Sequence, residues 1–409
     1  MEFKSHRGAC VSIISGNTKV LCDPWLCDGV YYGSWTHYPE YGWRDNFSDI
    51  THIYVSNNYP DHMDAETMKR LPKVPVLFHK SEELRESIEG LGFEARMLEN
   101  NVPLDLGGLK INILAADNND LSVRKKFLGC ANGQVDSMAV FQDRHHTFVN
   151  ANECPYQLSK HMLPKVKNQY PDVDMLFVAS FGAGPYPQCF DIPEFNKQKA
   201  IRLKKKTFIE RAAWFASDLG AKITFPVAGD YLLSGKLSPL NPFRGVPTMS
   251  EVCRYFEEAG IPVERIETYD EMEKTKYAKD VLARKDLDYE KDQVPKEEDL
   301  IPLLKEGWQR FEKKRLELEF KTSTALYIRV GDMMARISMG TKGNISIQKK
   351  IYDSRYVKIS LDPRLLHRIL QGPKVAHWSS AEIGSHLRFE RVPDFFERGI
   401  THCLGFLHA

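Results

Sequence analysis

Apolar and polar positions along the first 220 residues alternate in blocks that predict short strands and helices in turn. Two strands at 10–14 and 19–22 flank Gly16-Asn17 as a hairpin, and more strands are predicted at 52–55, 74–78, 93–97, 109–115, 137–142 and 175–180. Helices are predicted at 64–71, 81–90, 157–168 and 194–219, the last ending at Gly220. This alternation favours an α/β fold with mixed sheets inside and helices outside.

The second half of the chain changes character twice. Residues 268–320 are dense in charge and are predicted to be helical, over 291–297 and then 300–319. From residue 322 the pattern returns to strands, at 325–330, 335–338, 345–347 and 356–360. We therefore expect a first domain of residues 1–265, a helical connecting arm of residues 266–321, and a strand-rich portion of residues 322–409 that completes a pocket.

Composition narrows the class of protein. The 409 residues carry 56 Lys and Arg against 55 Asp and Glu, so no global field attracts nucleic acid or a membrane surface. No apolar run approaches the roughly 18 residues of a membrane span, and the first residues contain no apolar signal core. The eight cysteines are scattered without paired short spacings. We expect a cytoplasmic protein with free thiols that binds neither nucleic acid nor membrane.

The segment from Val55 to Asp64 is the most informative part of the chain. A strand runs into a polar loop, and Asp61 and His62 stand side by side where the next helix begins. A carboxylate and an imidazole in this position can reach one cavity and bind iron, zinc or manganese. The alternative is that Asp61 caps the helix and His62 packs against it.

Several motifs resemble the metallo-β-lactamase fold. Val20-Leu-Cys-Asp-Pro-Trp-Leu26 is similar to the turn that opens many chains of this superfamily, and Asp61-His62 follows at the expected interval. The segment from Thr147 to Cys154 resembles the strand that ends in the metal-bridging carboxylate. The stretch from His377 to Arg391 is similar to the branch of CMP-N-acetylneuraminate and UDP-N-acetylmuramate hydroxylases. The resemblance implies a metallo-β-lactamase-type αββα sandwich.

The loop departs from the superfamily at its metal ligands. The superfamily carries His-x-His-x-Asp-His, whereas this chain reads Asn57-x-Tyr59-x-Asp61-His62, and Glu153 stands where an aspartate is usual. The loss of two imidazoles argues against a dinuclear zinc hydrolase. The resemblance implies a single metal, iron or alternatively zinc, with Asp61, His62, Glu153 and Asn57 as ligands and Asp61, His62 and Tyr59 as catalytic residues. Complete loss of metal is also compatible with this pattern.

The resemblance implies a metal-dependent oxygenase or hydroxylase-like enzyme of a biosynthetic pathway, acting on a small nucleotide-linked or phosphate-bearing sugar. A mononuclear metallohydrolase and a catalytically degenerate ligand-binding scaffold are the alternatives. The hydroxylases also use a Rieske iron–sulfur module, which needs Cys-x-His and Cys-x-x-His pairs that this sequence lacks. Electrons would therefore come from a separate protein.

Two basic segments are candidate phosphate contacts. Arg388 and Arg391 can each grip phosphate oxygens with two parallel hydrogen bonds. The predicted substrate-binding residues are these two arginines together with His386, Trp378 and Ser380. The alternative is a terminal helix whose arginines pair with acids such as Glu390 and Asp394. Lys204–Lys206 is expected to be a solvated helix face, with a phosphate contact as the alternative, and residues 117–120 form either a turn or a further ligand segment.

Overall fold

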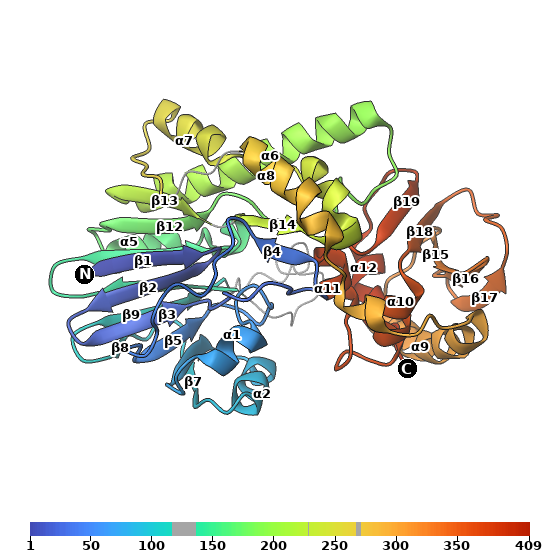
Figure 1. Ribbon diagram of the computed structural model, residues 1–409, viewed down its shortest axis with the longest axis horizontal. Coiled ribbons are helices and arrows are strands. Elements are labelled where there is room, and N and C mark those ends of the chain that lie inside the picture. Colours follow the sequence, from blue (N-terminus) through green and yellow to red (C-terminus); the bar gives the residue numbers. More distant parts are fainter. Residues whose placement is uncertain (117–135, 228, 267–270) are drawn as a thin grey trace.

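The structure is a computed structural model that describes residues 1–409 except 117–135, 228 and 267–270 (Figure 1). The expected turn or ligand segment at 117–120 lies outside the described residues. Two six-stranded sheets make up the amino-terminal part, with strand orders β1-β2-β3-β5-β6-β7 and β13-β12-β11-β10-β9-β8. The first sheet consists of β1 (Glu2–Arg7), β2 (Cys10–Ser15), β3 (Thr18–Cys22), β5 (His52–Val55), β6 (Val76–His79) and β7 (Ala95–Leu98). The second consists of β8 (Leu104–Asp105), β9 (Lys110–Ala115), β10 (Ser137–Gln142), β11 (Thr147–Asn152), β12 (Met175–Ala179) and β13 (Ile223–Val227).

The two sheets face each other across one apolar core. Side chains from the first sheet, such as Ile13 and Tyr54, meet Phe141 and Phe148 from the second. Helices α1 (Ala65–Arg70) and α2 (Glu82–Gly90) cover the outer face of the first sheet. The outer face of the second is covered by α4 (Tyr156–Ser159), α5 (Leu163–Gln169), α6 (Glu194–Leu219) and α7 (Met249–Glu258). The α/β sandwich expected from the sequence is confirmed, with its layers in the order αββα.

A third sheet forms the carboxy-terminal part, at the right of Figure 1. Its order is β17-β16-β15-β18-β19, and its strands are β15 (Ala325–Val330), β16 (Met333–Ser338), β17 (Asn344–Gln348), β18 (Tyr356–Ser360) and β19 (Arg388–Val392). Its helices are α9 (Glu297–Glu317), α10 (Pro363–Leu370), α11 (Trp378–Ile383) and α12 (Arg398–Leu404). One apolar core joins these elements to Trp25, Tyr31 and Trp35 of the first part.

The segment between the two parts contains short elements. They are β14 (Tyr231–Leu233), η1 (Gly235–Phe243), α8 (Glu271–Asp280), η2 (Leu282–Arg284) and η3 (Asp288–Lys291). Strand β14 pairs with β4 (Trp35–His37), which belongs to the first part of the chain. No helix within the described ranges is both long enough and apolar enough to cross a membrane.

Three helix predictions need correction. The helix expected at 157–168 is two helices, and the second begins at Leu163 with Pro164 in its first turn, where the missing N–H costs nothing. The helix expected at 291–297 is absent, because Pro295 disfavours a helical conformation for the preceding residue and α9 begins at Glu297. The terminal helix offered as an alternative for Arg388 and Arg391 is a strand, β19, paired with β18.

Candidate metal centre

Three side chains meet just beyond the ends of β5 and β11. Ligand atoms of Asp61, His62 and Glu153 all lie within 4.8 Å of one another. The Nε2 atom of His62 is 3.7 Å from Oδ2 of Asp61 and 3.6 Å from Oε2 of Glu153. His62 is 1% exposed, whereas the Glu153 side chain is 31% exposed. The cluster is therefore buried at His62 and partly exposed at Glu153.

The loop after β5 is held in shape by its own polar groups. The side chain of Asn57 accepts a hydrogen bond from the Tyr59 backbone N–H at 2.9 Å, and the backbone N–H of His62 donates to the Tyr59 carbonyl at 2.9 Å. Helix α1 is capped by Asp64, which accepts from the Thr67 N–H at 2.8 Å. The alternative in which Asp61 caps this helix is therefore wrong, and its carboxylate faces His62 instead.

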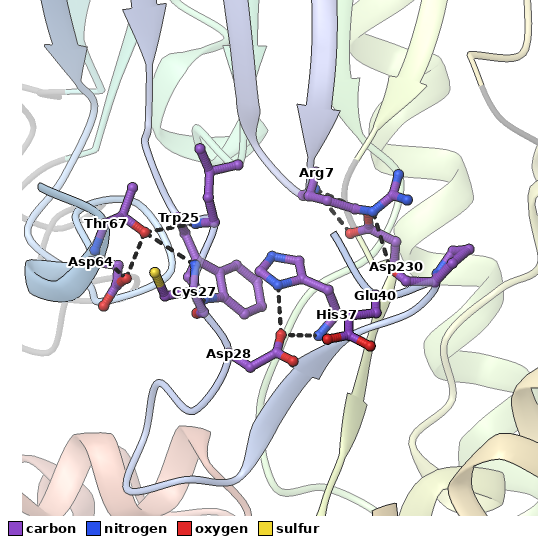
Figure 2. Close-up of polar contacts among 12 residues, drawn as sticks. Arg7, Trp25, Cys27, Asp28, His37, Glu40, Asp64, Thr67 and Asp230 are labelled. Carbon is purple, nitrogen blue, oxygen red and sulfur yellow. Dashed lines mark hydrogen bonds and ion pairs between the residues drawn. The ribbon is translucent and has the colours of Figure 1, made fainter. Parts of the chain in front are cut away.

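Figure 2 shows how α1 is fastened to the turn that follows β3. The Thr67 hydroxyl donates to Asp64 at 2.6 Å and accepts the backbone N–H groups of Leu26 and Cys27, at 2.9 and 3.1 Å. This turn begins at Asp23, so the same contacts fix the position of Asp23 relative to His62.

Asp23 orients the imidazole of His62 through its Nδ1 atom. It is fully buried, and its Oδ2 lies 3.4 Å from Nδ1 of His62. The carboxylate also accepts the Ser56 N–H at 2.8 Å and the Asn152 side-chain amide at 2.6 Å, so it links the ends of three strands. With Nδ1 held in this way, Nε2 is the nitrogen that faces Asp61 and Glu153, an arrangement common around metal-bound histidines.

Glu153 is aimed by an irregularity at the end of β11. The pairing of β11 with β12 shifts register between Asn150 and Asn152, and Asn152 has a positive φ of 40°. Asparagine tolerates this left-handed conformation better than most residues. The chain turns at Asn152, and the next side chain points across to His62. Such local irregularities often redirect a side chain at a functional site.

Tyr31 connects the cluster to the carboxy-terminal part of the chain. Its phenol donates to Oδ1 of Asp61, and its backbone carbonyl accepts from Nε2 of His386 at 2.8 Å. Burial lowers the pKa of His386 to about 4. The ring is therefore neutral at pH 7, with the proton on Nε2, and Nδ1 is free to accept from the Tyr289 hydroxyl at 3.1 Å.

The cluster has an excess of negative charge. Burial raises the pKa of Asp61 to about 6, with His62 opposing and Glu153 adding to the shift. Burial also raises the pKa of Asp136 to about 7, and Glu153 again contributes. Although burial alone would lower it, the carboxylates of Asp61 and Asp23 hold the pKa of His62 well above its usual value. One imidazole among several carboxylates is a surrounding that favours a further cation.

The donor set fits a metal ion. One nitrogen and two carboxylate oxygens, already oriented by Asp23 and Tyr31, match the hard and borderline ligands preferred by iron, manganese or zinc. Asp61, His62 and Glu153 would hold the ion. Asn57 uses its carbonyl oxygen within the loop, so its role as a fourth ligand stays a prediction. Tyr59 is 41% exposed at the mouth of the site, and partial burial together with Asp136 and Asp61 raises its pKa to about 12.

The predicted substrate-binding residues are not gathered in one place. Trp378 is buried and donates its indole N–H to the Leu407 carbonyl at 2.8 Å, and His386 lies behind Tyr31. Ser380, on α11, is partly buried. Arg391 forms an ion pair with Asp394 at 2.5 Å and lies 4.4 Å over the Phe190 ring. Arg388 is exposed and lines a cavity of about 400 Å³. The other charged residues of that lining are Lys197, Lys358, Asp191 and Glu390, and Lys358 pairs with Glu390.

Sequence reasoning missed the residues that support the centre. Asp23 belonged to the motif quoted for the resemblance but received no role, and Tyr31 received no role either. Asn152 and Asp136 flank strands that were predicted, at the ends where site residues gather. Asp23, Asp136 and Asn152 could have been found in the sequence by their positions at strand ends. The sequence contained no signal for the contact between Tyr31 and Asp61.

Comparison with known proteins finds relatives that match part of the chain. No protein-family model matches it. The chain is 27% identical over 262 residues to a Mycolicibacterium smegmatis protein named "Putative Rieske 2Fe-2S iron-sulfur protein", an alignment that covers 59% of this chain and 46% of that one. It is 23% identical over 240 residues to the cytidine monophosphate-N-acetylneuraminic acid hydroxylase of Sus scrofa, covering 55% of this chain and 51% of that one. These alignments span about half of each relative.

Among solved structures, the chain is similar to CmlA, a diiron beta-hydroxylase from Streptomyces venezuelae. The sequence identity is 17% and the TM-score is 0.41, with 64% of this chain and 52% of that chain covered.

Proposed function

We propose that this protein is a metal-dependent oxygenase or hydroxylase-like enzyme that holds one metal ion, iron, between Asp61, His62 and Glu153. The observation that carries the proposal is the convergence of these three ligand atoms within 4.8 Å in a cluster rich in carboxylates. Two carboxylates and one imidazole leave coordination positions open, as oxygen-activating iron sites require. The hydroxylase named among the relatives supports the reaction class.

The residues around the ion have separate tasks. When bound, the metal would polarise or activate oxygen or water. Asp23 fixes the orientation of His62, and Tyr31 holds one oxygen of Asp61 so that the other faces His62. Tyr59 keeps its proton at neutral pH, because its pKa is raised to about 12. Its hydroxyl, at the mouth of the site, is therefore the group that can donate a hydrogen bond to a substrate.

The substrate we propose is a small phosphate-bearing or nucleotide-linked sugar, with electrons delivered by a separate protein. The hydroxylase relative acts, by its name, on a cytidine monophosphate sugar, and the Rieske protein relative supports an electron-transfer partner. Arg388 is the proposed phosphate contact, since it is exposed beside Lys358 and Lys197. Replacement of Arg388 by Lys should then weaken binding of such a sugar, because an ammonium cannot form two parallel hydrogen bonds.

Two other functions are alternatives to this proposal. A mononuclear metallohydrolase would use the same three ligands with zinc, and a degenerate ligand-binding scaffold would hold no metal. Asn57 and Tyr59 stand where the superfamily has histidines, which favours either of these two functions over a dinuclear hydrolase. The three possibilities differ in the metal that the purified protein retains.

The test is elemental analysis of wild-type protein beside His62→Ala and His62→Gln. We expect roughly stoichiometric iron in the wild type and none in either variant, with the fold kept as judged by circular dichroism. His145→Ala is the matched control, because His145 lies in the turn between β10 and β11. Zinc in place of iron would support the hydrolase, no metal would support the scaffold, and unchanged iron in both His62 variants would remove the site.

A further inference from the structure

A cavity of about 480 Å³ is lined by Tyr231 and Leu232 of β14 and by none of the candidate metal ligands. It is enclosed by the loop after β13, by η1 and the segment that follows it, by α8, and by one turn of α6. The charged side chains that line it are all cationic, namely Lys205, Arg244, Lys274 and Lys279. No aspartate or glutamate is among its described lining residues. A cavity of this size suits a small-molecule ligand.

Arg244 is the buried cation at the base of this cavity. It is 5% exposed, its Nη1 donates to the Tyr231 carbonyl at 2.7 Å, and its guanidinium lies 3.8 Å from the Tyr231 ring centroid. Its Nη2 is buried and has no hydrogen-bond partner in the part of the chain that is described. No ion pair there joins Arg244 to a carboxylate. A buried guanidinium with an unused donor is costly unless a ligand oxygen meets it.

The lysines around Arg244 differ in how far the protein offsets their charge. Lys204 was expected on a solvated helix face, but its ammonium donates to the Tyr186 carbonyl at 2.8 Å. Burial, followed by the charge of Arg244, lowers the pKa of Lys204 to about 7. Lys205 is balanced by Glu251 at 2.9 Å, whereas Lys279 is exposed at the rim with no ion pair within the described ranges. The positive charges of Arg244 and Lys279 are therefore not compensated by an ion pair in the part of the chain that the structure describes.

We infer that this cavity binds the phosphate group of a small anionic ligand, with Arg244 as the anchor and Lys279 at the entrance. Two cations, Arg244 and Lys279, with no ion pair among the described residues suit a group with more than one negative charge, and the planar guanidinium matches phosphate oxygens. The inference does not rest on the proposed function, because none of the candidate metal ligands lines this cavity. The wall between the two sites is aromatic, with Tyr231 stacked on Trp35 at 3.5 Å and Trp35 beside Tyr31 at 4.5 Å.

The test is isothermal titration calorimetry of the full chain, which measures its affinity for inorganic pyrophosphate and for succinate, an anion without phosphorus. We expect pyrophosphate to bind in preference to succinate, and Arg244→Lys to weaken it about ten-fold or more, the loss typical of a charge-assisted hydrogen bond. Lys279→Gln keeps the buried anchor and should weaken binding several-fold. Lys276→Gln, on the same helix but outside the lining, is the matched control and should bind like wild type.

Three results would overturn the inference. They are absence of pyrophosphate binding to the wild type, wild-type affinity in both Arg244→Lys and Lys279→Gln, and loss of binding in Arg388→Lys but not in Arg244→Lys. The last would place the anion in the neighbouring cavity that contains Arg388. Metal content measured on the same samples should be unchanged, so a failure here is distinguishable from a failure of the metal centre.

Discussion

Replacement of Tyr31 by phenylalanine would test how the metal centre is held. The phenol of Tyr31 donates to Asp61, and the side chain is 3% exposed with its ring 4.5 Å from that of Trp35. Phenylalanine keeps this packing and removes only the donor. Loss of a partner that orients a metal ligand typically lowers metal affinity about 10- to 100-fold, or about 1.4–2.7 kcal/mol. The same range is typical of a hydrogen bond to a charged group.

The assay is an anaerobic titration of the metal-free protein with Fe(II), and with Mn(II) as a redox-stable substitute, in competition with a chromophoric chelator. Tyr170→Phe is the matched control, because the Tyr170 hydroxyl accepts a hydrogen bond from Asn112 at 3.0 Å on the opposite side of the second sheet. Both variants should melt within a few degrees of each other. Wild-type metal affinity in a folded Tyr31→Phe protein would refute the reasoning, since Asp61 would then need no fixed orientation.

Three further outcomes are expected. Asn57→His combined with Tyr59→His should raise zinc affinity, because imidazole nitrogen is a better zinc donor than amide or phenol oxygen; unaltered affinity would mean that the loop no longer has the geometry of a metal site. Although burial opposes it, hydrogen bonds from Lys4, His6 and Tyr41 lower the pKa of Asp45 to about 2. Asp45→Asn should therefore lower the free energy of unfolding by about 1 kcal/mol at pH 7, after allowance for solvent screening. In denaturant titrations, the difference from wild type should disappear as the pH falls from about 4 towards 2. Arg391→Met should lower the melting temperature by a few degrees, because it removes the ion pair with Asp394 and the stacking on Phe190; an unchanged melting curve would show that these contacts contribute nothing.

Local patterns predicted the layers of the sandwich well. The hairpin around Gly16 and the helix that ends at Gly220 depend on short-range chemistry, and both lie where the sequence placed them. Failures came where tertiary pairing overrides local preference. The segment Arg388–Val392 is charged and follows a helix, yet it forms a strand because β18 offers a free edge. Residues 291–297 are rich in helix-forming side chains, but Pro295 delays the helix.

The residues of the candidate site also divide into those that local sequence patterns could predict and those that they could not. Asp61 and His62 are neighbours at a strand-to-helix junction, so the sequence alone indicated that they share a cavity. Glu153 could be added only through the resemblance, since it lies 91 residues further on. The groups that orient the ligands were out of reach for local reasoning. Asp23 meets His62 because two strands end side by side, and Tyr31 meets Asp61 because a loop with positive φ at residue 31 turns its ring inward.

The carboxy-terminal part is connected to the candidate metal centre through hydrogen bonds. His386 donates to the Tyr31 carbonyl, and Tyr289 fixes the tautomer that makes this possible. The Tyr31 ring then delivers its hydroxyl to Asp61, 30 residues along the chain. Because Trp25, Tyr31 and Trp35 share one apolar core with β15, β16 and α11, the position of Asp61 depends on the packing of the third sheet. A shift of β19 or α11 would move the backbone that holds His386 and, through Tyr31, would change the position of Asp61 in the candidate site.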